Sequence, residues 1–161
     1  MDTLTNMAAT LGETLKVRAE TVGIAESSTG GLISAALLAV PGASKYFVGG
    51  GVIYTREARR NLLDLPDEVV TMRGATEAYA LLAARAIRDK LDTTWGFSES
   101  GASGPTGNRY GDDAGHSCFA IVGPIERAMT LETGQSDREA NMWRFAEEAF
   151  GFIESVLRDA D

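Results

Sequence analysis

The segment Glu26-Ser27-Ser28-Thr29-Gly30-Gly31 places three hydroxyl side chains directly before two glycines. Gly30 and Gly31 allow the backbone to approach a ligand closely, and the hydroxyls of Ser27 and Thr29 can donate or accept hydrogen bonds. Free backbone N–H groups at the start of a following helix also attract anions such as phosphate. The segment therefore predicts a turn that holds a small polar ligand, and simple helix capping by a Ser or Thr is the structural alternative.

A second polar segment, residues 99–115, is long and rich in glycine, and it includes Ser103, Gly104 and Thr106. Loops of this length inside compact domains are usually functional or disordered. The segment lacks the Gly-Lys-Ser/Thr ending of a phosphate-binding Walker A loop. A binding loop that covers the first turn and a solvated surface loop both fit this sequence.

Cationic side chains follow a further apolar run, in the segment Tyr54-Thr55-Arg56-Glu57-Ala58-Arg59. Because ligands in α/β sheets bind beyond the carboxyl ends of strands, these arginines would reach the same edge as the first turn. Solvated charges at the start of a helix are the alternative.

Hydrophobic periodicity and turn signals predict the elements that position these segments. Strands are expected at residues 21–25, 47–54, 93–98, 116–123 and 126–133. Helices are expected at residues 4–15, 31–40, 56–63, 76–91 and 137–158. The glycine run at 49–51 indicates a bulge or a close backbone approach. This order predicts an α/β fold, a three-layer α/β/α sandwich with a mixed sheet, formed by residues 1–161 as one domain.

The composition argues against several classes of partner. A chain of 161 residues with a formal net charge of −8 should repel nucleic-acid backbones and anionic lipid. No apolar run approaches the roughly 20 residues of a membrane-spanning helix. One histidine, His116, and one cysteine, Cys118, are too few for a zinc site of the usual type. We therefore expect a cytoplasmic protein with no nucleic-acid, membrane or metal partner, and a homo-oligomer, as is common for α/β proteins with small pockets.

Six short patterns follow one another along the chain. They are Ala-Glu-Ser-Ser-Thr-Gly-Gly at 25–31, Pro-Gly-Ala-Ser at 41–44, Gly-Gly-Val-Ile-Tyr-Thr-Arg-Glu-Ala-Arg at 50–59, Gly-Ala-Thr at 74–76, Ser-Gly-Ala-Ser-Gly-Pro-Thr-Gly-Asn at 100–108, and Ser-Asp-Arg at 136–138. Each is weak alone, but in this order they resemble the CinA C-terminal domain family, named for competence and DNA-damage induction. The resemblance covers nearly the whole chain.

This resemblance implies an activity, because the family includes bacterial nicotinamide mononucleotide deamidases of the PncC type. The reaction hydrolyses the carboxamide and yields nicotinate mononucleotide and ammonia, with a serine nucleophile, a lysine base and no metal or cofactor. Carried over to this chain, Ser27 is the first candidate for the nucleophile and Ser44 is the second. The family's ligand-contact segments correspond here to Thr29, Gly30, Gly31, Tyr54, Ser103, Gly104, Thr106 and Arg144.

One departure from the family pattern affects the mechanism, because Arg59 stands where the family has its lysine. A serine–lysine mechanism needs a neutral amine to accept the hydroxyl proton. A guanidinium effectively never deprotonates, so Arg59 suits an anion better than it suits proton transfer. Lys45, next to Ser44, and His116, with its near-neutral pKa, are the alternative bases.

Three hypotheses follow from the sequence. The first is a pyridine mononucleotide amidohydrolase that uses Ser27 or Ser44 and a base other than Arg59, with backbone N–H groups holding the oxyanion. The second is a binding protein that keeps the pocket and uses Arg59 to bind an anion without turnover. The third is an enzyme that acts on a different substrate, since fold and function separate easily.

Overall fold

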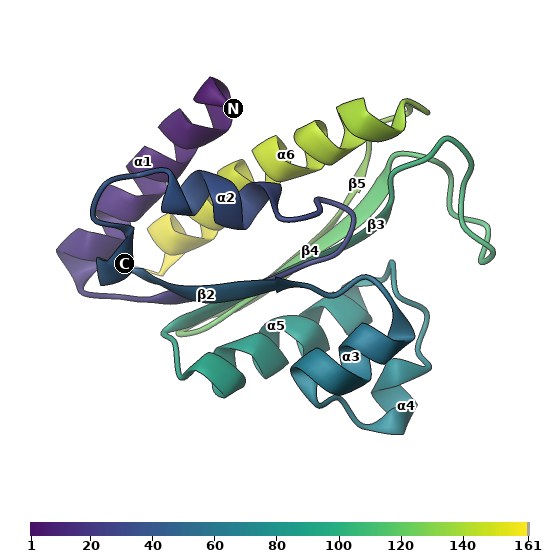
Figure 1. Ribbon diagram of the computed structural model, residues 1–161, viewed down its shortest axis with the longest axis horizontal. Coiled ribbons are helices and arrows are strands. Elements are labelled where there is room, and N and C mark those ends of the chain that lie inside the picture. Colours follow the sequence, from purple (N-terminus) through teal and green to yellow (C-terminus); the bar gives the residue numbers. More distant parts are fainter. Residues whose placement is uncertain (161) are drawn as a thin grey trace.

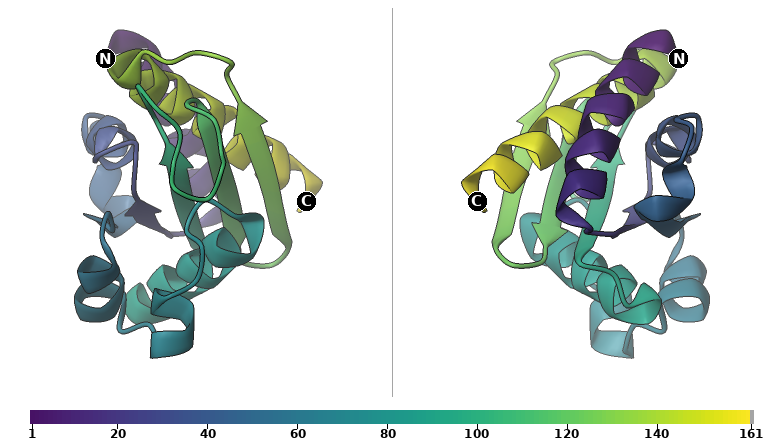
Figure 2. Two further views of the ribbon diagram at one scale, coloured as in Figure 1. Left: turned by 90° about the vertical axis from the view of Figure 1, so that its right-hand side faces the viewer. Right: turned by 90° about the vertical axis from the view of Figure 1, so that its left-hand side faces the viewer.

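The protein is described here by a computed structural model that covers residues 1–160 and consists of a central sheet between two helical layers (Figure 1). Helices α1, α2 and α6 cover one face of the sheet, and α3, α4 and α5 cover the other, as two perpendicular views confirm (Figure 2). The helices are α1 (Asp2–Arg18), α2 (Leu32–Leu38), α3 (Arg56–Leu63), α4 (Asp67–Val70), α5 (Glu77–Leu91) and α6 (Arg138–Asp159), with a short 3₁₀ turn, η1 (Ala43–Lys45). The predicted three-layer α/β/α sandwich is therefore confirmed.

The sheet is mixed, as predicted, and runs in the order β2-β1-β3-β4-β5. Its strands are β1 (Val22–Glu26), β2 (Phe47–Val52), β3 (Trp95–Ala102), β4 (His116–Val122) and β5 (Glu126–Glu132). Strand β1 is parallel to β2 and β3, whereas β4 is antiparallel to β3 and β5. Strands β1, β2 and β3 therefore end at one edge of the sheet, the edge where ligands bind in open α/β folds.

The prediction that a loop begins at residue 99 is wrong. Strand β3 continues as far as Ala102, with Glu99 opposite Phe119 and Ala102 opposite His116 on β4. The side chains in this part of β3 are small or polar, so no apolar alternation marks the strand, and pairing with the buried strand β4 determines its conformation. Glu99 therefore lies on paired strand backbone beside the end of β1, and the loop is confined to residues 103–115.

The helix starts agree well with their sequence signals. Thr76 caps α5 by accepting a hydrogen bond from the Tyr79 N–H at 3.1 Å, and Asp137 caps α6 by accepting one from the Ala140 N–H at 2.9 Å. Helix α2 is shorter than the expected 31–40, and the single turn of α4 was not predicted. Side chains of Thr and Asp at these positions satisfy N–H groups that the helix itself leaves unpaired.

Three apolar clusters hold the layers together. The first lies between the sheet and α1, α2 and α6, and it includes the fully buried rings of Tyr46, Trp95 and Phe119. A β-carbon at Gly12 would lie 2.8 Å from the Tyr46 ring, so the glycine lets α1 approach that ring. The second lies beneath α3, α4 and α5, around Tyr79, and the third joins α5 to β4. Across residues 1–160, every helix is too short or too polar to span a bilayer.

The glycine run of β2 allows α2 to pack closely on the sheet. A β-carbon at Gly50 would lie 2.5 Å from the Ser34 hydroxyl oxygen and 3.1 Å from the Ile24 carbonyl oxygen. The pairing of β2 with β1 also shifts register beside Val22. The sequence indicated a bulge or a close approach at this run, and the close approach at Gly50 lets Ser34 of α2 lie against Ile24 of β1.

Candidate functional site

A polar pocket of about 320 Å³ lies beyond the carboxyl ends of β1, β2 and β3, and we call it the site pocket. Ligand pockets in proteins commonly measure about 300–1,000 Å³, so this volume suits a small molecule. Its walls are formed by Ser27, Tyr54, Arg56, Arg59, Met72, Gly74, Ala75, Ser100, Gly101, Asn108, Arg109 and Tyr110. The first turn, the segment after β2 and the 103–115 loop therefore meet, although they are far apart in the sequence.

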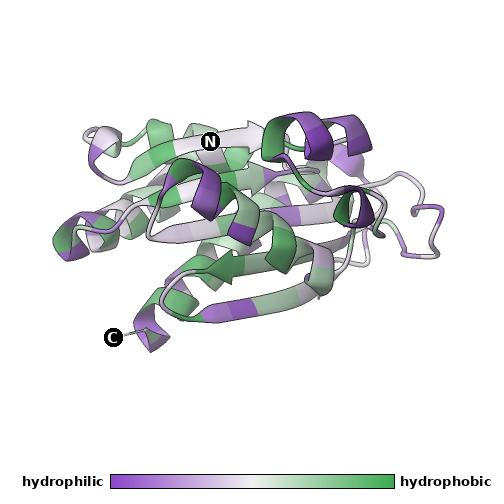
Figure 3. Cartoon of the chain, turned by 90° about the horizontal axis from the view of Figure 1, so that it is seen from below, coloured by the Kyte–Doolittle hydropathy of each residue, from purple (hydrophilic) through white to green (hydrophobic). Residues whose placement is uncertain are grey.

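A second pocket of about 220 Å³ adjoins the first and shares Tyr54, Gly101 and Asn108 with it. Its other walls are Ser28, Ala102, Ser103, Gly104, Thr106, Gly107 and Arg138. Figure 3 shows the 103–115 loop at the right-hand end of the molecule in white and purple, the colours of neutral and hydrophilic residues. The loop therefore supplies polar walls to both pockets.

The first turn is built around the carboxylate of Glu26, which is completely buried. Its two oxygens accept hydrogen bonds from the backbone N–H groups of Gly31 at 3.0 Å, Ile33 at 3.1 Å and Ser34 at 2.8 Å. The hydroxyls of Ser34, at 2.7 Å, and Thr29, at 2.8 Å, donate to the same carboxylate. The carboxylate at the end of β1 thus occupies the N-terminus of α2.

A second buried carboxylate, Glu99, holds the other side of the turn. It accepts hydrogen bonds from the N–H groups of Ser27 at 3.1 Å and Thr29 at 2.9 Å. The hydroxyls of Ser28 and Ser117 also donate to Glu99, the latter at 2.9 Å. All partners of Glu26 and Glu99 are N–H or O–H donors, the pattern of ionised carboxylates, which only accept. We call Glu26 and Glu99 the carboxylate pair.

The carboxylate pair corrects one expectation about the turn. The sequence suggested free helix N–H groups for a ligand anion or an oxyanion. The N–H groups of Gly31, Ile33 and Ser34 already bind Glu26, and that of Leu32 binds the Thr29 carbonyl oxygen at 3.2 Å. The turn itself requires glycine, because Gly30 and Gly31 have φ angles of 62° and 98°. Ligand anions must therefore be held by side chains rather than by the N-terminus of α2.

The three hydroxyl residues of the turn have different roles. Thr29 is fully buried, and its hydroxyl lies 2.8 Å from Glu26 and 3.1 Å from Glu99, so its single proton serves the carboxylate pair. Ser28 is buried and donates to Glu99. Ser27 borders the site pocket, and its hydroxyl makes no hydrogen bond with any part of residues 1–160. Ser27 is thus the hydroxyl of this turn that is free to contact a ligand.

Arg59 forms part of the wall of the site pocket and is held in place from two sides. Its Nη1 donates to the carbonyl oxygens of Val70 at 3.0 Å and Met72 at 2.9 Å. Its guanidinium carbon lies 4.0 Å from the centroid of the Tyr79 ring, a cation–π contact. Burial raises the pKa of Tyr79, and Arg59 acts in the opposite direction. Arg59 is therefore a fixed positive charge beside Ser27.

Three exposed arginines, Arg56, Arg109 and Arg138, border the two pockets, and we call them the arginine rim. Arg56 and Arg109 donate to the Tyr110 hydroxyl at 3.2 Å and 2.6 Å, and together they hold the pKa of Tyr110 below its usual value. Arg138 donates to the Tyr54 hydroxyl at 3.0 Å and to a loop carbonyl at 2.6 Å. In the described part of the chain, no rim arginine and no atom of Arg59 pairs with a carboxylate.

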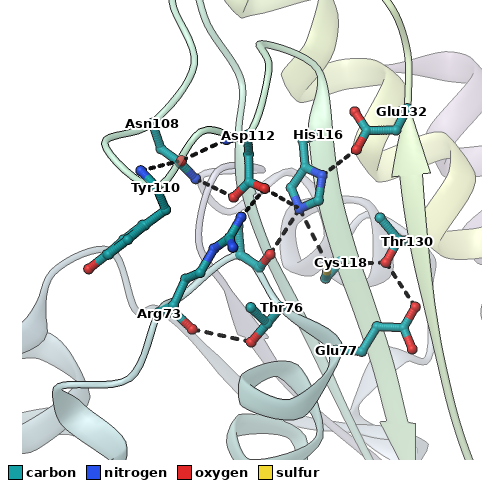
Figure 4. Close-up of polar contacts among 11 residues, drawn as sticks. Arg73, Thr76, Glu77, Asn108, Tyr110, Asp112, His116, Cys118, Thr130 and Glu132 are labelled. Atoms are coloured by element: carbon teal, nitrogen blue, oxygen red, sulfur yellow. Dashed lines mark hydrogen bonds and ion pairs between the residues drawn. The ribbon is translucent and has the colours of Figure 1, made fainter.

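His116 does not border the site pocket, and both of its ring nitrogens are occupied (Figure 4). Nδ1 contacts the Glu132 carboxylate, and Nε2 lies 2.9 Å from the Ala75 carbonyl oxygen and 3.8 Å from Asp112. Burial lowers the pKa of His116, but Glu132, Ala75 and Asp112 together raise it above the ordinary value. With an acceptor at each nitrogen, the ring is set up as an imidazolium that joins the 103–115 loop to β5.

Asp112 is the loop residue of this cluster (Figure 4). It pairs with Arg73 and accepts a hydrogen bond from the Asn108 amide at 2.7 Å. Burial raises the pKa of Asp112, and the hydrogen bonds from Arg73 and Asn108 bring it below its ordinary value. Asn108 and Asp112 flank Arg109 and Tyr110 in the loop, so their hydrogen bonds hold this part of the loop in place on both sides.

Several residues expected at the site lie elsewhere. Ser44 and Lys45 belong to η1, which precedes β2, and the start of β2 pairs with the first residue of β1. Ser27 follows the last residue of β1, so Ser44 lies at the opposite end of the sheet. Arg144 lies on α6 and pairs with Glu148 at 2.5 Å, and it borders a different pocket. Arg138, at the start of α6, borders the second pocket instead of Arg144.

Other residues of the site were not expected from the sequence. Glu26 and Glu99 are unremarkable as single acidic residues. Glu26 binds the turn and the start of α2, within eight residues of itself, whereas Glu99 reaches the turn only because β1 and β3 pair. Arg109 and Tyr110 interrupt the family's glycine pattern, which is the one signal that could have indicated them. Within residues 1–160, no group of three His, Cys, Asp or Glu side chains is placed to hold a metal ion.

The fold and the site together define a three-layer α/β protein with an arginine-bordered pocket at the carboxyl ends of its parallel strands. The sequence profile of the CinA C-terminal domain family matches residues 4–157. The chain therefore belongs to the CinA C-terminal domain family.

Relatives named as CinA-like proteins agree with this assignment. The chain is 38% identical over 120 residues to one from Cyanothece sp., which covers 74% of this chain and 29% of the relative. It is 35% identical over 144 residues to one from Salinibacter ruber, which covers 89% of this chain and 35% of the relative. The chain thus spans about a third of the length of these relatives.

Crystal structures of related proteins share the fold. A CinA superfamily protein from Klebsiella pneumoniae superposes with a TM-score of 0.90 at 24% identity, over 97% of this chain and 98% of that one. A competence/damage inducible protein from Agrobacterium tumefaciens gives a TM-score of 0.88 at 24% identity, over 97% and 96% of the two chains. These likenesses support the architecture alone.

Proposed function

We propose that the site pocket binds a small anionic molecule, namely a mononucleotide with a planar base of the pyridine type. The observation that carries this proposal is the gathering of Arg59 and the arginine rim around one region, without carboxylate partners in residues 1–160, in a chain of net charge −8. Elsewhere arginines do have such partners, as in the pairs Arg60–Asp67 and Arg85–Glu126. Guanidinium groups bind phosphate and carboxylate bidentately, so the unpaired arginines offer the charge that an anionic ligand needs.

The remaining walls fit the rest of such a ligand. The rings of Tyr54 and Tyr110 border the site pocket and provide apolar faces for a planar base. The hydroxyls of Ser27 and Ser100 are available along the same walls for ribose or carboxamide groups. Membership of the CinA C-terminal domain family supports the choice of a pyridine mononucleotide, because the family includes nicotinamide mononucleotide deamidases.

A second candidate function is hydrolysis of the carboxamide of nicotinamide mononucleotide, and the free hydroxyl of Ser27 favours it. Ser27 Oγ would attack the carboxamide carbon, and the NH₂ group would take up a proton and leave as ammonia. Water would then hydrolyse the acyl-serine ester, which releases the carboxylate and restores the Ser27 hydroxyl. Arg59 can stabilise the negative charge that develops on the carboxamide oxygen, but it cannot accept the Ser27 proton. That proton would pass to solvent water, so we expect turnover to be slow.

Calorimetry and ammonia release test the two candidates separately. Purified protein is titrated with nicotinamide mononucleotide, and the same mixture is assayed for ammonia, with Ser27→Ala as the control. Binding that is lost in an Arg56→Gln/Arg109→Gln variant supports the first candidate, and undetectable binding of both nicotinamide mononucleotide and nicotinate mononucleotide overturns it. Ammonia release above that of Ser27→Ala supports the second candidate, and equal release in both proteins overturns it.

A further inference from the structure

The guanidinium of Arg59 has a donor that the protein does not use. Its Nε is buried and is the one buried side-chain nitrogen or oxygen without a hydrogen-bond partner in residues 1–160. Nη1 is occupied by the carbonyl oxygens of Val70 and Met72, and the flat face of the group lies on Tyr79. Buried donors are almost always paired, so an unpaired one at a pocket wall indicates a missing acceptor.

The other terminal nitrogen of the guanidinium, Nη2, lies beside Gly74 on the wall of the site pocket. A β-carbon at Gly74 would lie 2.2 Å from Arg59 Nη2 and 3.5 Å from Ser100 Oγ. Gly74 therefore lets the guanidinium lie flat against the wall with Nη2 beside the Ser100 hydroxyl. Ser27 and Ser100 line the same pocket and can donate hydrogen bonds to an acceptor placed there.

The geometry of the donors distinguishes between ligand groups. Nε and Nη2 lie along one edge of a planar guanidinium, and two parallel N–H groups match the two oxygens of a carboxylate. A carboxamide presents one oxygen and one NH₂ group, so one of its ends would face an N–H donor with another donor. A guanidinium fixed by Val70, Met72 and Tyr79 cannot rotate to avoid that contact, whereas a lysine ammonium could.

We propose that Arg59 makes the site pocket selective for the carboxylate form of a pyridine mononucleotide over its carboxamide form. The proposal rests on the proposed function, that the pocket binds a mononucleotide. Arg59 receives the ring carboxylate, while Arg56 and Arg109 at the pocket mouth receive the phosphate. The ligand class is thus a planar base that carries a carboxylate on its ring and a second anionic group on its ribose.

Two ligands that differ in one group provide the test. Nicotinate mononucleotide and nicotinamide mononucleotide share the ring, the ribose and the phosphate, so the ratio of their dissociation constants isolates the carboxylate. We expect calorimetry on the wild-type protein to give at least about tenfold tighter binding of the carboxylate form. In Arg59→Gln the ratio should fall to within about threefold of unity, with a smaller decrease in Arg59→Lys.

The control variant is Arg60→Gln, which removes a neighbouring exposed arginine that pairs with Asp67. It changes net charge as Arg59→Gln does, and it should leave the ratio unchanged. If Arg59→Gln does not fold, Arg59→Lys carries the test, because it keeps the charge and the length of the side chain.

The outcomes separate this inference from the proposed function. If neither ligand binds to the wild-type protein, the proposed function fails and the selectivity fails with it. If both bind with similar affinity, the pocket binds mononucleotides but the selectivity of Arg59 is overturned. If the carboxylate form binds more tightly and this preference survives in Arg59→Gln, another group selects the ligand and the inference is also overturned.

Discussion

The carboxylate pair holds the turn that carries Ser27, and the arginine rim borders the two pockets beside that turn, yet the hydrogen bonding of the two groups differs completely. Glu26 and Glu99 are 0% and 2% exposed, and every contact they make is with this chain's own donors. Arg56, Arg109 and Arg138 are exposed, and in residues 1–160 they contact tyrosine hydroxyls and backbone carbonyls but no carboxylate. The hydrogen-bonding capacity of the carboxylate pair is therefore satisfied within the fold, whereas the charges of the arginine rim are available to a ligand.

This difference has a physical cause. An ionised carboxylate loses its hydration when it is buried, and only several donors can compensate for that loss. The N–H groups that satisfy Glu26 and Glu99 are therefore unavailable to anything in the pocket. An exposed guanidinium remains hydrated without a partner, so it can exchange water for a phosphate or carboxylate at little cost. Stability and ligand affinity should accordingly depend on different residues.

Glu99→Gln tests the structural side of the comparison and should have the largest effect. The amide end of glutamine would place an NH₂ donor among the Ser27 N–H, the Thr29 N–H and the Ser117 hydroxyl, which are themselves donors. We expect the free energy of unfolding to fall by about 2–4 kcal/mol, because buried donors lose their acceptor. Urea denaturation followed by circular dichroism measures this loss.

The matched control is Glu126→Gln, which changes the same carboxylate in an exposed pair. Glu126 contacts Arg85 at 2.9 Å and is 47% exposed. Exposed pairs of this kind contribute about 0.2–1 kcal/mol, so the control should lose much less stability than Glu99→Gln. Equal losses in the two variants would show that the buried contacts of Glu99 are not special.

Arg56→Gln and Arg109→Gln test the ligand side of the comparison. Each removes a charge from the pocket mouth, and each should weaken mononucleotide binding by about tenfold, or about 1.4 kcal/mol. The free energy of unfolding should stay within about 0.5 kcal/mol of the wild-type value, because neither side chain is buried. Calorimetry and urea denaturation on the same samples check both parts, and a large loss of stability with unchanged affinity would reverse the roles.

Gly74→Ala tests the position of Arg59 without changing its charge. The new methyl group would lie 2.2 Å from Arg59 Nη2, so the flexible end of the arginine must move. We expect binding of the carboxylate ligand to weaken by about three- to fivefold, a smaller effect than loss of a rim arginine, with little change in stability. Gly151→Ala is the control. Apart from the neighbouring residues and the backbone of its own helix, no atom of residues 1–160 lies within 4 Å of the added carbon.

The scaffold could be predicted because its signals are local. The apolar stripes of α1 and α5, the capping residues Thr76 and Asp137, and the β4–β5 hairpin all follow from neighbouring residues in the sequence. The second half of β3 could not be predicted, because Ser100 and Gly101 have no apolar pattern and become strand through pairing with β4. Local propensity is a weak guide where tertiary pairing decides the conformation.

The site was predicted in part, and the failures have a common origin. Ser27, Tyr54, Thr106 and Arg59 reach the two pockets as their positions after strands suggested. No local pattern indicated that Glu99 would bind the N–H groups of the turn, because these residues are 70 or more positions apart. Contacts between distant segments determine which donors remain free, and a single sequence carries no direct record of them.

His116→Gln tests the connection between the sheet and the loop that carries part of the arginine rim, and it should have the smallest effect. The folded state raises the pKa of His116, so the proton on its ring stabilises the folded protein. This contribution is complete below the unfolded pKa of about 6.5 and is lost as pH rises through the folded value. A neutral ring can donate from one nitrogen only, so either Glu132 or the Ala75 carbonyl then loses its donor.

The wild-type protein should therefore exceed His116→Gln in unfolding free energy at pH 5.5, and this advantage should decrease as the pH rises toward 8.5. The difference should be below about 1 kcal/mol, because Glu132 is 57% exposed and water screens the pair. Cys118 and Asp112 also lie close to the ring. Burial raises the pKa of Cys118 and the pKa of Asp112 is lowered, so neither group titrates in this range. An advantage that grows with pH would mean that His116 is neutral in the folded protein and does not join the loop to β5 through its charge.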